Sequence, residues 1–244
     1  MLAEKWLDTL GEALSKLRRT QLTAIDRAAE MVVESVTSGG ALHLYDTGHM
    51  LEREAVHRAG GLYMVTPFTF GLNLNDPARP RPGGTAPSPE EVAGFVRYAL
   101  SASSLRPGDV LIIGSVSGRA TIPIELALQA RARGIKVVAL TSVPYSKVAE
   151  CQHPSGRRLY EVADLAIDYG TAIGDAAVEV PGLQVQACPT SGIVAAAIIW
   201  ALTAQVIERL LARGLTPHVF KSVNLPDGPE FNARARREYE QTGY

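Results

Sequence analysis

The stretch Asp109-Val-Leu-Ile-Ile-Gly-Ser-Val-Ser-Gly-Arg119 decides the fold. Its first half is an aliphatic run, which is typical of a strand buried on both faces of a parallel sheet. Glycine and serine then replace the apolar residues, which indicates a tight loop. A helical pattern follows over residues 120–133. The stretch therefore predicts a strand, a loop and a helix in succession, which is the repeating unit of α/β proteins.

The same alternation extends to both sides of this unit. Further helical patterns occupy residues 49–59 and 89–102, and the second begins with the capping box Ser88-Pro-Glu-Glu91. Strands that alternate with helices predict an α/β fold, namely a three-layer α-β-α sandwich with a five-stranded, mainly parallel sheet and a flavodoxin-like or Rossmann-like topology. The predicted strands are residues 41–45, 62–66, 109–113, 136–140 and 165–168.

Two long apolar patterns flank these strands. Residues 2–36 predict one or two helices that are too long to lie on one small sheet, so part of them is expected to pack on another subunit. Residues 190–213 are apolar nearly all round, which indicates a helix buried in the core or at a subunit interface. We expect three parts: a helical segment 1–40 on the domain or a partner subunit, a domain over 41–214, and an extension 215–244 that completes the domain or reaches a partner.

Two remaining segments fit this plan less regularly. Residues 71–87 are rich in glycine, proline, asparagine and aspartate, and so long a loop is either a functional lid or disordered. The extension contains an extended piece over 218–224 and a predicted helix over 230–240.

The composition excludes several classes of protein. With 24 Lys and Arg against 25 Asp and Glu, the net charge of −1 lacks the positive field that nucleic acid or a membrane surface requires. Cys151 and Cys188 fit no disulfide or zinc pattern. The first residues lack the pattern of a signal peptide, and the longest apolar or glycine run, 192–202, is too short to span a bilayer. We expect a cytoplasmic protein that binds neither nucleic acid nor membranes.

Small hydroxyl residues follow the predicted strands, where the ligands of open parallel sheets bind. Hydroxyls and free N–H groups at helix N-termini attract anions, although any one of these residues could simply cap its helix. The loop with Ser115 and Ser117 supplies two hydroxyls, and Gly118 permits close approach of the backbone. These donors suit a phosphate dianion, and a nucleotide fits less well because the nucleotide-binding glycine motifs are absent. The four junctions are Asp46-Thr-Gly-His49, Gly114-Ser-Val-Ser-Gly-Arg119, Thr141-Ser142 and Pro189-Thr-Ser-Gly192.

This pattern resembles the sugar isomerase (SIS) domain over most of the chain. The resemblance is closest to a bacterial group of single SIS-domain proteins, similar in turn to N-acetylmuramic acid 6-phosphate etherases. It implies that the protein binds a phosphosugar and that the serine-rich loop holds the phosphate. The residues that carry the resemblance are Arg58-Ala-Gly-Gly61, Ser117-Gly-Arg119, Pro123-Ile-Glu125, Tyr145-Ser-Lys147, Ser155 to Asp164, Gly174-Asp-Ala176, Pro189-Thr-Ser191 and Val219 to Asn224.

Two positions depart from the SIS pattern. Ala120 stands where a threonine is common, and Met50 stands where relatives carry a serine. Each change removes one hydroxyl donor unless Thr121 or Thr47 substitutes, so both bear on the strength of phosphate binding. The residues expected to bind substrate or phosphate are Thr47, Gly48, Ser115, Ser117, Gly118, Arg119, Thr141, Ser142, Thr190 and Ser191.

Sugar-phosphate isomerisation needs a base that moves a proton between adjacent carbons, and a carboxylate and an imidazole are suited to it. The candidates are Glu54, Glu125 and His49, although each also fits an ordinary place on a helix or loop. Arg119 could clamp the phosphate, or pair with Glu125 or Asp109. The histidines lack metal-ligand spacing, so neither a metal nor a cofactor is expected.

The leading hypothesis is therefore an aldose–ketose isomerase that acts on a sugar phosphate. An etherase or lyase on an amino-sugar phosphate is a second possibility, because of the Ser-Gly-Arg match. The third is a phosphosugar sensor without catalysis. The apolar surface of the two long helices predicts a homodimer or a higher homo-oligomer.

Overall fold

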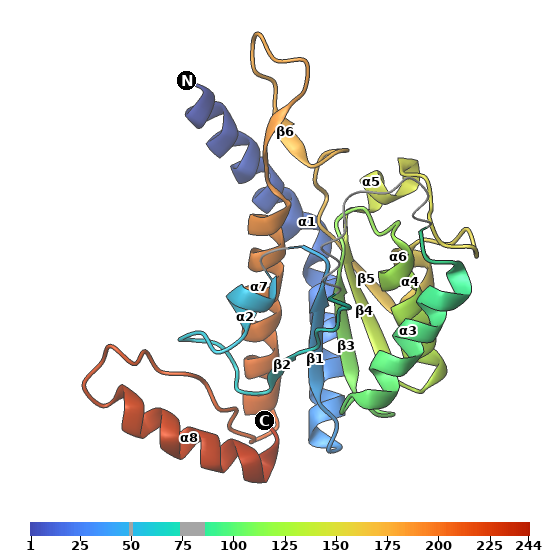
Figure 1. Ribbon diagram of the computed structural model, residues 1–244. Coiled ribbons are helices and arrows are strands. Elements are labelled where there is room, and N and C mark those ends of the chain that lie inside the picture. The colour runs from blue at the N-terminus through green and yellow to red at the C-terminus, as the bar shows by residue number, and fades with distance from the viewer. Residues whose placement is uncertain (49–50, 74–85) are drawn as a thin grey trace.

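The computed structural model describes residues 1–48, 51–73 and 86–244 (Figure 1). The candidate base His49, the departure at Met50 and most of the predicted loop 71–87 lie outside the described residues.

A five-stranded parallel sheet in the order β2-β1-β3-β4-β5 forms the centre of the fold. The prediction of an α/β sandwich is confirmed, and every strand runs parallel to its neighbours. The strands are β1 (Leu42–Asp46), β2 (Val65–Pro67), β3 (Val110–Gly114), β4 (Lys136–Thr141) and β5 (Leu165–Asp168).

Helices cover both faces of this sheet, as Figure 1 shows. One face carries α1 (Leu2–Thr37), α2 (Leu51–Ala55) and α7 (Ser191–Ala212), and the other carries α3 (Pro89–Ala102), α4 (Thr121–Ala132) and α6 (Leu159–Val162). The remaining elements are α5 (Val143–Val148), the hairpin strands β6 (Ala176–Val178) and β7 (Ala187–Pro189), and α8 (Gly228–Thr242).

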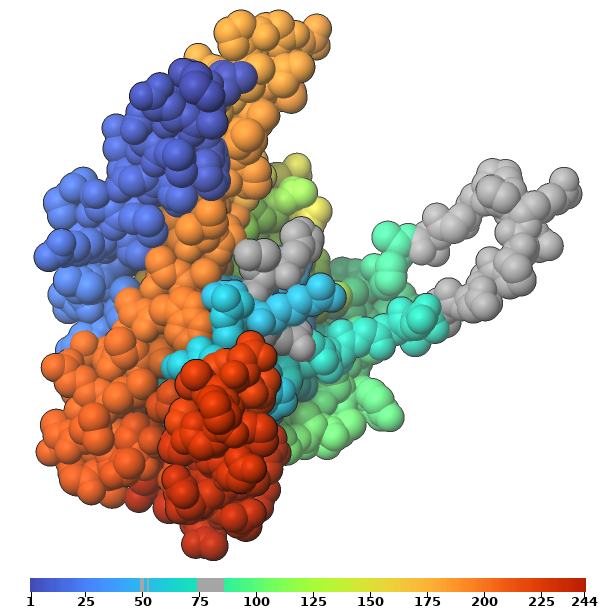
Figure 2. Space-filling model, turned by 90° about the vertical axis from the view of Figure 1, so that its left-hand side faces the viewer, coloured from blue at the N-terminus to red at the C-terminus, as the bar shows by residue number. Residues whose placement is uncertain are grey.

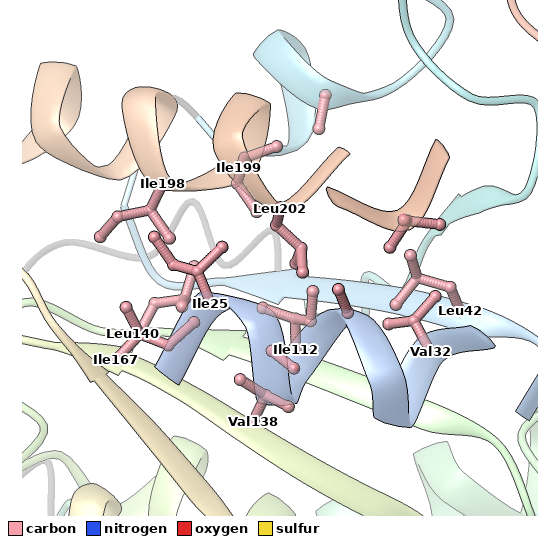
Figure 3. Close-up of a cluster of buried hydrophobic side chains, with 14 of the residues drawn as sticks. Ile25, Val32, Leu42, Ile112, Val138, Leu140, Ile167, Ile198, Ile199 and Leu202 are labelled. Carbon is pink, nitrogen blue, oxygen red and sulfur yellow. The ribbon is translucent and has the colours of Figure 1, made fainter. Parts of the chain in front are cut away.

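The aliphatic run of β3 supplies both hydrophobic cores, because its side chains alternate across the sheet. Ile112 packs in the core below α1 and α7, together with Val138 and Ile198 (Figure 3). Leu111 and Ile113 pack in the opposite core, below α3 and α4. Every residue of β3 is buried, as expected for a central strand.

The N-terminal pattern forms a single helix of 36 residues, and its buried side chains lie between Leu17 and Val36. The first half extends past the sheet beside the β6–β7 hairpin, and Figures 1 and 2 both show this projection. By length and composition, α7 alone among the helices of the described residues is long and apolar enough to cross a membrane. Nine of its residues are buried, and it packs along α1 and the sheet as a core helix does.

Several predicted boundaries were wrong. The second strand begins at Val65, because residues 60–63 pair instead with residues 218–220 at the side of the sheet. The described part of the helix predicted over 49–59 ends at Ala55, and His57 adopts a left-handed φ of 55°, which no helix accommodates. The extended piece 218–224 contributes only a bridge at Val219, and α8 is longer than predicted at both ends.

The strand order creates a topological switch point between β1 and β3. The chain leaves β1 toward β2 on one side, whereas β3, β4 and β5 follow on the other side. In doubly wound sheets of the order 2-1-3-4-5, ligands bind outside the carboxyl ends of the strands at this point. The loops after β1 and β3 are therefore the first place to look for a site.

Candidate functional site

Hydrogen bonds tie three of the four predicted junctions together. After β1, the backbone N–H and the hydroxyl of Thr47 both donate to the carbonyl of Gly114, at 3.0 and 3.1 Å. After β4, the hydroxyl of Thr141 and the N–H of Ser142 both donate to the carbonyl of Val116, at 3.1 and 2.8 Å. The loops that follow β1, β3 and β4 thus form one connected surface at the switch point.

The loop after β3 leaves its donors available. Among the described residues, no protein acceptor binds the hydroxyl of Ser115 or Ser117, and Ala120 caps α4 without a side-chain hydrogen bond. Gly118 adopts a φ of 55°, which turns the chain into the helix. Successive free N–H groups at such a turn form an anion-binding concavity. The N–H groups without an acceptor in the described residues are those of Val116, Ser117, Arg119, Ala120, Thr121 and Ile122.

We call this loop, residues 115–122, the serine cradle. A side chain at position 118 would not fit it, because a Cβ there would lie 2.7 Å from the hydroxyl oxygen of Thr141 and 3.0 Å from that of Ser146. Thr141 and Ser142 support the cradle, since the hydroxyl of Thr141 and the N–H of Ser142 both donate to the carbonyl of Val116. The hydroxyl of Ser142 donates instead to the carbonyl of Thr171 at 3.0 Å. The predicted hydroxyls therefore fall into two groups. Those of Ser115 and Ser117 have no acceptor among the described residues, whereas those of Thr141 and Ser142 donate to backbone carbonyls.

A cavity of about 260 Å³ adjoins these loops on the α7 side of the sheet. Asp46 and Gly48 line it from β1, Val116 from the cradle, Tyr169 from the end of β5, and Asp175 and Ser191 from the entry to α7. It is bounded by the start of α7, so the fourth predicted junction contributes to the same site.

The remaining predicted binding residues take different places. Thr190 is the N-cap of α7 but makes no capping hydrogen bond with its side chain. The hydroxyl of Ser191 donates to Asp175 at 2.5 Å. Arg119 donates to the carbonyl of Glu150 at 3.3 Å, and it forms an ion pair with neither Glu125 nor Asp109.

Glu54 does not line the cavity. Its carboxylate accepts a hydrogen bond from the indole of Trp200 on α7 at 2.9 Å and forms an ion pair with Arg58 at 2.6 Å. These contacts fix α2 and the following turn to α7. Both oxygens of this candidate base are thus engaged with the protein.

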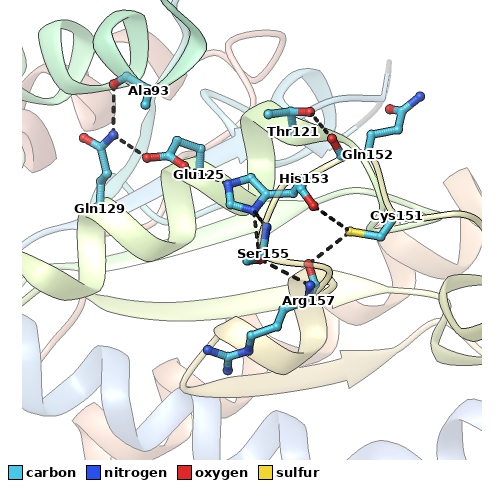
Figure 4. Close-up of polar contacts among 9 residues, drawn as sticks. All are labelled: Ala93, Thr121, Glu125, Gln129, Cys151, Gln152, His153, Ser155 and Arg157. Carbon is cyan, nitrogen blue, oxygen red and sulfur yellow. Dashed lines mark hydrogen bonds and ion pairs between the residues drawn. The ribbon is translucent and has the colours of Figure 1, made fainter. Parts of the chain in front are cut away.

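Glu125 lies on the other side of the sheet, in the network that Figure 4 shows. Its Oε2 lies 2.8 Å from Nε2 of His153, and its Oε1 accepts from the amide of Gln129 at 2.6 Å. Nδ1 of His153 lies 2.8 Å from the hydroxyl of Ser155. The His153 side chain is 8% exposed, so α4 and the 151–157 loop are joined by a shielded polar contact.

The pKa of Glu125 reflects this network. Burial tends to raise the pKa, but the hydrogen bonds from Gln129 and His153 and the nearby positive charges hold it below its usual value. Glu125 therefore remains a carboxylate at neutral pH. Within the described residues, no group of three or more histidine, cysteine, aspartate or glutamate side chains is placed to hold a metal ion.

Three ionisable residues of the cavity, Asp46, Tyr169 and Asp175, were not among the predicted binding residues, although Asp46 and Asp175 stood in motifs that the sequence analysis singled out. Tyr169 follows the fifth predicted strand directly, so the rule that ligands bind at strand ends could have found it there. Asp175 lies in a left-handed turn with a φ of 67° and accepts from the N–H of Ser191 at 3.0 Å. Only the folded chain shows that this carboxylate caps α7.

The chain shares this fold with solved structures of sugar-phosphate proteins. It matches a phosphoheptose isomerase from Francisella tularensis with a TM-score of 0.53 and 14% identity, over 84% of this chain and 95% of the other. It matches the Vibrio vulnificus NanR protein complexed with ManNAc-6P with a TM-score of 0.50 and 14% identity, over 98% of this chain and 68% of the other. At 14% sequence identity, the similarity to these two structures concerns the fold alone.

Sequence relatives cover nearly the whole chain. A UPF0309 protein of Streptomyces griseus is 36% identical over 98% of this chain and 95% of its own length. A UPF0309 protein of Shouchella clausii is also 36% identical, over 98% of this chain and 99% of its own length. The model of the SIS domain matches residues 5–142, which include β1, β3 and the serine cradle. The chain therefore belongs to the SIS domain family and is a relative of the UPF0309 proteins.

Proposed function

We propose that this protein binds a sugar phosphate, with the phosphate in the serine cradle and the sugar in the adjoining cavity. One observation carries the proposal: two hydroxyls and six backbone N–H groups of residues 115–122 have no acceptor among the described residues and lie at the switch point of the sheet. Buried or half-buried donors without acceptors are costly, and a phosphate dianion satisfies several of them at once. The ManNAc-6P bound to the NanR neighbour supports this class of ligand.

We further propose that the protein catalyses the aldose–ketose isomerisation of the bound sugar phosphate. Three candidates for the proton-transfer group come from the sequence. His49 follows Gly48, which lines the cavity. Glu54 and Glu125 are held by Trp200 and His153, so either would have to leave its partner in order to act. The imidazole is for this reason the first candidate to test.

A panel of hexose, pentose and amino-sugar phosphates tests binding and turnover together. We expect saturable binding of at least one sugar phosphate in calorimetric titration, no binding of the same sugar without phosphate, and exchange of the proton at C2 in deuterated water. Release of lactate or another group would instead identify an etherase or lyase, and binding without exchange would identify a sensor. Absence of binding across the panel would refute the proposal.

We also propose that the protein is cytoplasmic and that it forms a homo-oligomer. The near-neutral charge and the packing of α7 in the core favour a soluble, cytoplasmic protein. Apolar side chains are exposed on the projecting part of α1 and on the β6–β7 hairpin, and they favour a homodimer or a higher homo-oligomer. Figure 2 shows these two segments side by side.

A further inference from the structure

The described lining of the cavity beside the serine cradle is acidic, and this charge affects which kind of sugar can bind there. Its ionisable lining within the described residues consists of Asp46, Tyr169 and Asp175, and no lysine, arginine or histidine is among them. Any inference about sugar selection rests on the proposed function, because it concerns the part of the sugar phosphate that extends beyond the cradle.

Asp46 is fixed with capacity to accept further hydrogen bonds. One carboxylate oxygen accepts from the N–H of Gly48 at 3.0 Å, and the other accepts from the N–H of Leu51 at 3.3 Å. Each oxygen of a carboxylate can accept two hydrogen bonds, so each keeps one site that no other described residue occupies. Gly114 makes room for this arrangement, since a Cβ there would lie 2.6 Å from Oδ1 of Asp46.

Asp175 supplies the second carboxylate of the cavity lining. It accepts from both the N–H and the hydroxyl of Ser191, at 3.0 and 2.5 Å. The N-terminus of α7 is therefore already paired with a protein anion, and the carboxylate offsets the positive end of the helix dipole. This end of the cavity does not attract a second anion.

Tyr169 provides an independent sign of a ligand. The residue is 3% exposed and lines the cavity, and its hydroxyl is open to the cavity instead of being bonded to a described residue. Burial, followed by the charges of Asp46 and Asp175, raises its pKa well above the usual value. The phenol is thus a neutral group that can both donate and accept.

From these three groups we infer that the cavity distinguishes sugar phosphates by the charge of the sugar group that lies farthest from the phosphate. It accepts hydroxyl or ammonium groups, which donate to Asp46 and Asp175, and it rejects a sugar whose far end carries a carboxylate. The two carboxylates thereby act as specificity determinants, and sugar acids, including sugars with a lactyl ether, are excluded.

Two isosteric sugar phosphates test this selection in calorimetric titrations of the full chain. Glucose 1-phosphate and glucuronic acid 1-phosphate differ only in a hydroxymethyl group and a carboxylate. We expect the acid to bind the wild type at least about tenfold more weakly, a difference of about 1.4 kcal/mol, because like charges at close range repel. In Asp46→Asn and in Asp175→Asn, the ratio should fall below about threefold. Asparagine tolerates the left-handed backbone at 175 and retains an acceptor for Ser191.

Two further measurements separate this inference from the proposed function. Inorganic phosphate should bind the wild type and both variants equally, since the cradle is unchanged. Tyr169→Phe should weaken both sugar phosphates to the same extent and leave inorganic phosphate unaffected. Two results would overturn the inference while leaving sugar-phosphate binding intact. The first is equal affinity of the wild type for the neutral and the acidic sugar phosphate. The second is a ratio of these two affinities that neither variant changes. Failure of phosphate and of every sugar phosphate to bind would overturn both.

Discussion

Single residues in the serine cradle are fixed by packing and backbone geometry together. Gly118 combines a φ of 55° with immediate neighbours in Thr141 and Ser146. A left-handed conformation is unfavourable for any residue with a Cβ, and the neighbours leave no volume for one. The glycine is thus required by the turn from β3 into α4.

The substitution Gly118→Ala should accordingly lower the free energy of unfolding by about 2–4 kcal/mol, the sum of backbone strain and overpacking. The measurement is chemical denaturation monitored by circular dichroism. Gly94→Ala is the matched control, because Gly94 lies inside α3 and a Cβ there meets nothing within 4 Å. The control should raise the stability by about 0.5–1 kcal/mol. Equal stabilities of the two variants would contradict this account of the turn.

At the scale of elements, the 150–157 loop braces the start of α4. The N–H of Gln152 donates to the carbonyl of Arg119, and the hydroxyl of Thr121 donates to the carbonyl of Gln152, both at 3.0 Å. About one turn further along α4, Glu125 binds His153. The cradle is therefore held at its helical end by a loop about 30 residues away in the sequence.

The pairing of Glu125 with His153 predicts a dependence of stability on pH. Since the pKa of Glu125 is lower in the folded than in the unfolded chain, its contribution is present above the unfolded pKa and is lost as the pH falls through the folded pKa. Glu125→Ala should cost about 1–3 kcal/mol at neutral pH, because it leaves Nε2 of His153 without its partner and removes one of the two acceptors of the Gln129 amide.

Denaturation of the wild type and Glu125→Ala at neutral and at acidic pH measures this effect. The difference between the two proteins should shrink as the pH falls below the usual glutamate pKa of 4.5. Glu240→Ala, at an exposed position of α8, should change the stability by no more than about 0.5 kcal/mol at either pH. A difference between wild type and Glu125→Ala that stays constant with pH would argue against the ion pair.

The elements also show what the sequence can and cannot reveal. The five strands were predictable because aliphatic runs such as Val110 to Ile113 fit a sheet covered on both faces. The β6–β7 hairpin was not, since strands of three residues carry little periodic signal, and the equally short β2 was predicted only as part of the longer run 62–66. The serine loop followed from local pattern alone. The convergence of Asp46, Tyr169 and Asp175 on one cavity required the folded chain, because β3 and β4 lie between β1 and β5 in the sheet.

The whole molecule has a face that one chain leaves uncovered. The first half of α1 and the β6–β7 hairpin project together past the sheet (Figures 1 and 2). They border a groove of about 920 Å³ that reaches Thr190 at the start of α7. Leu7 and Val185 are 59% and 73% exposed on these segments. Exposed apolar side chains of this size are typical of an interface between subunits.

Light scattering at micromolar concentration should give a mass of at least two chains of 26.1 kDa each. The double variant Leu7→Glu/Val185→Glu should shift the mass toward that of one chain, because it places charges in the interface. Tyr98→Glu is the control, since Tyr98 is also 73% exposed but lies on α3, on the other side of the sheet. A single-chain mass for the wild type would contradict the proposed assembly.

The most direct test of the central claim is a titration of the double variant Ser115→Ala/Ser117→Ala with the sugar phosphate that the wild type binds best. If the two hydroxyls hold the phosphate, the binding free energy should weaken by about 2–4 kcal/mol, since each charge-assisted hydrogen bond contributes about 1.5–3 kcal/mol and the two contributions overlap. Ser104→Ala, at an exposed position after α3, should bind as the wild type does. Unchanged affinity of the double variant would show that the phosphate is held elsewhere.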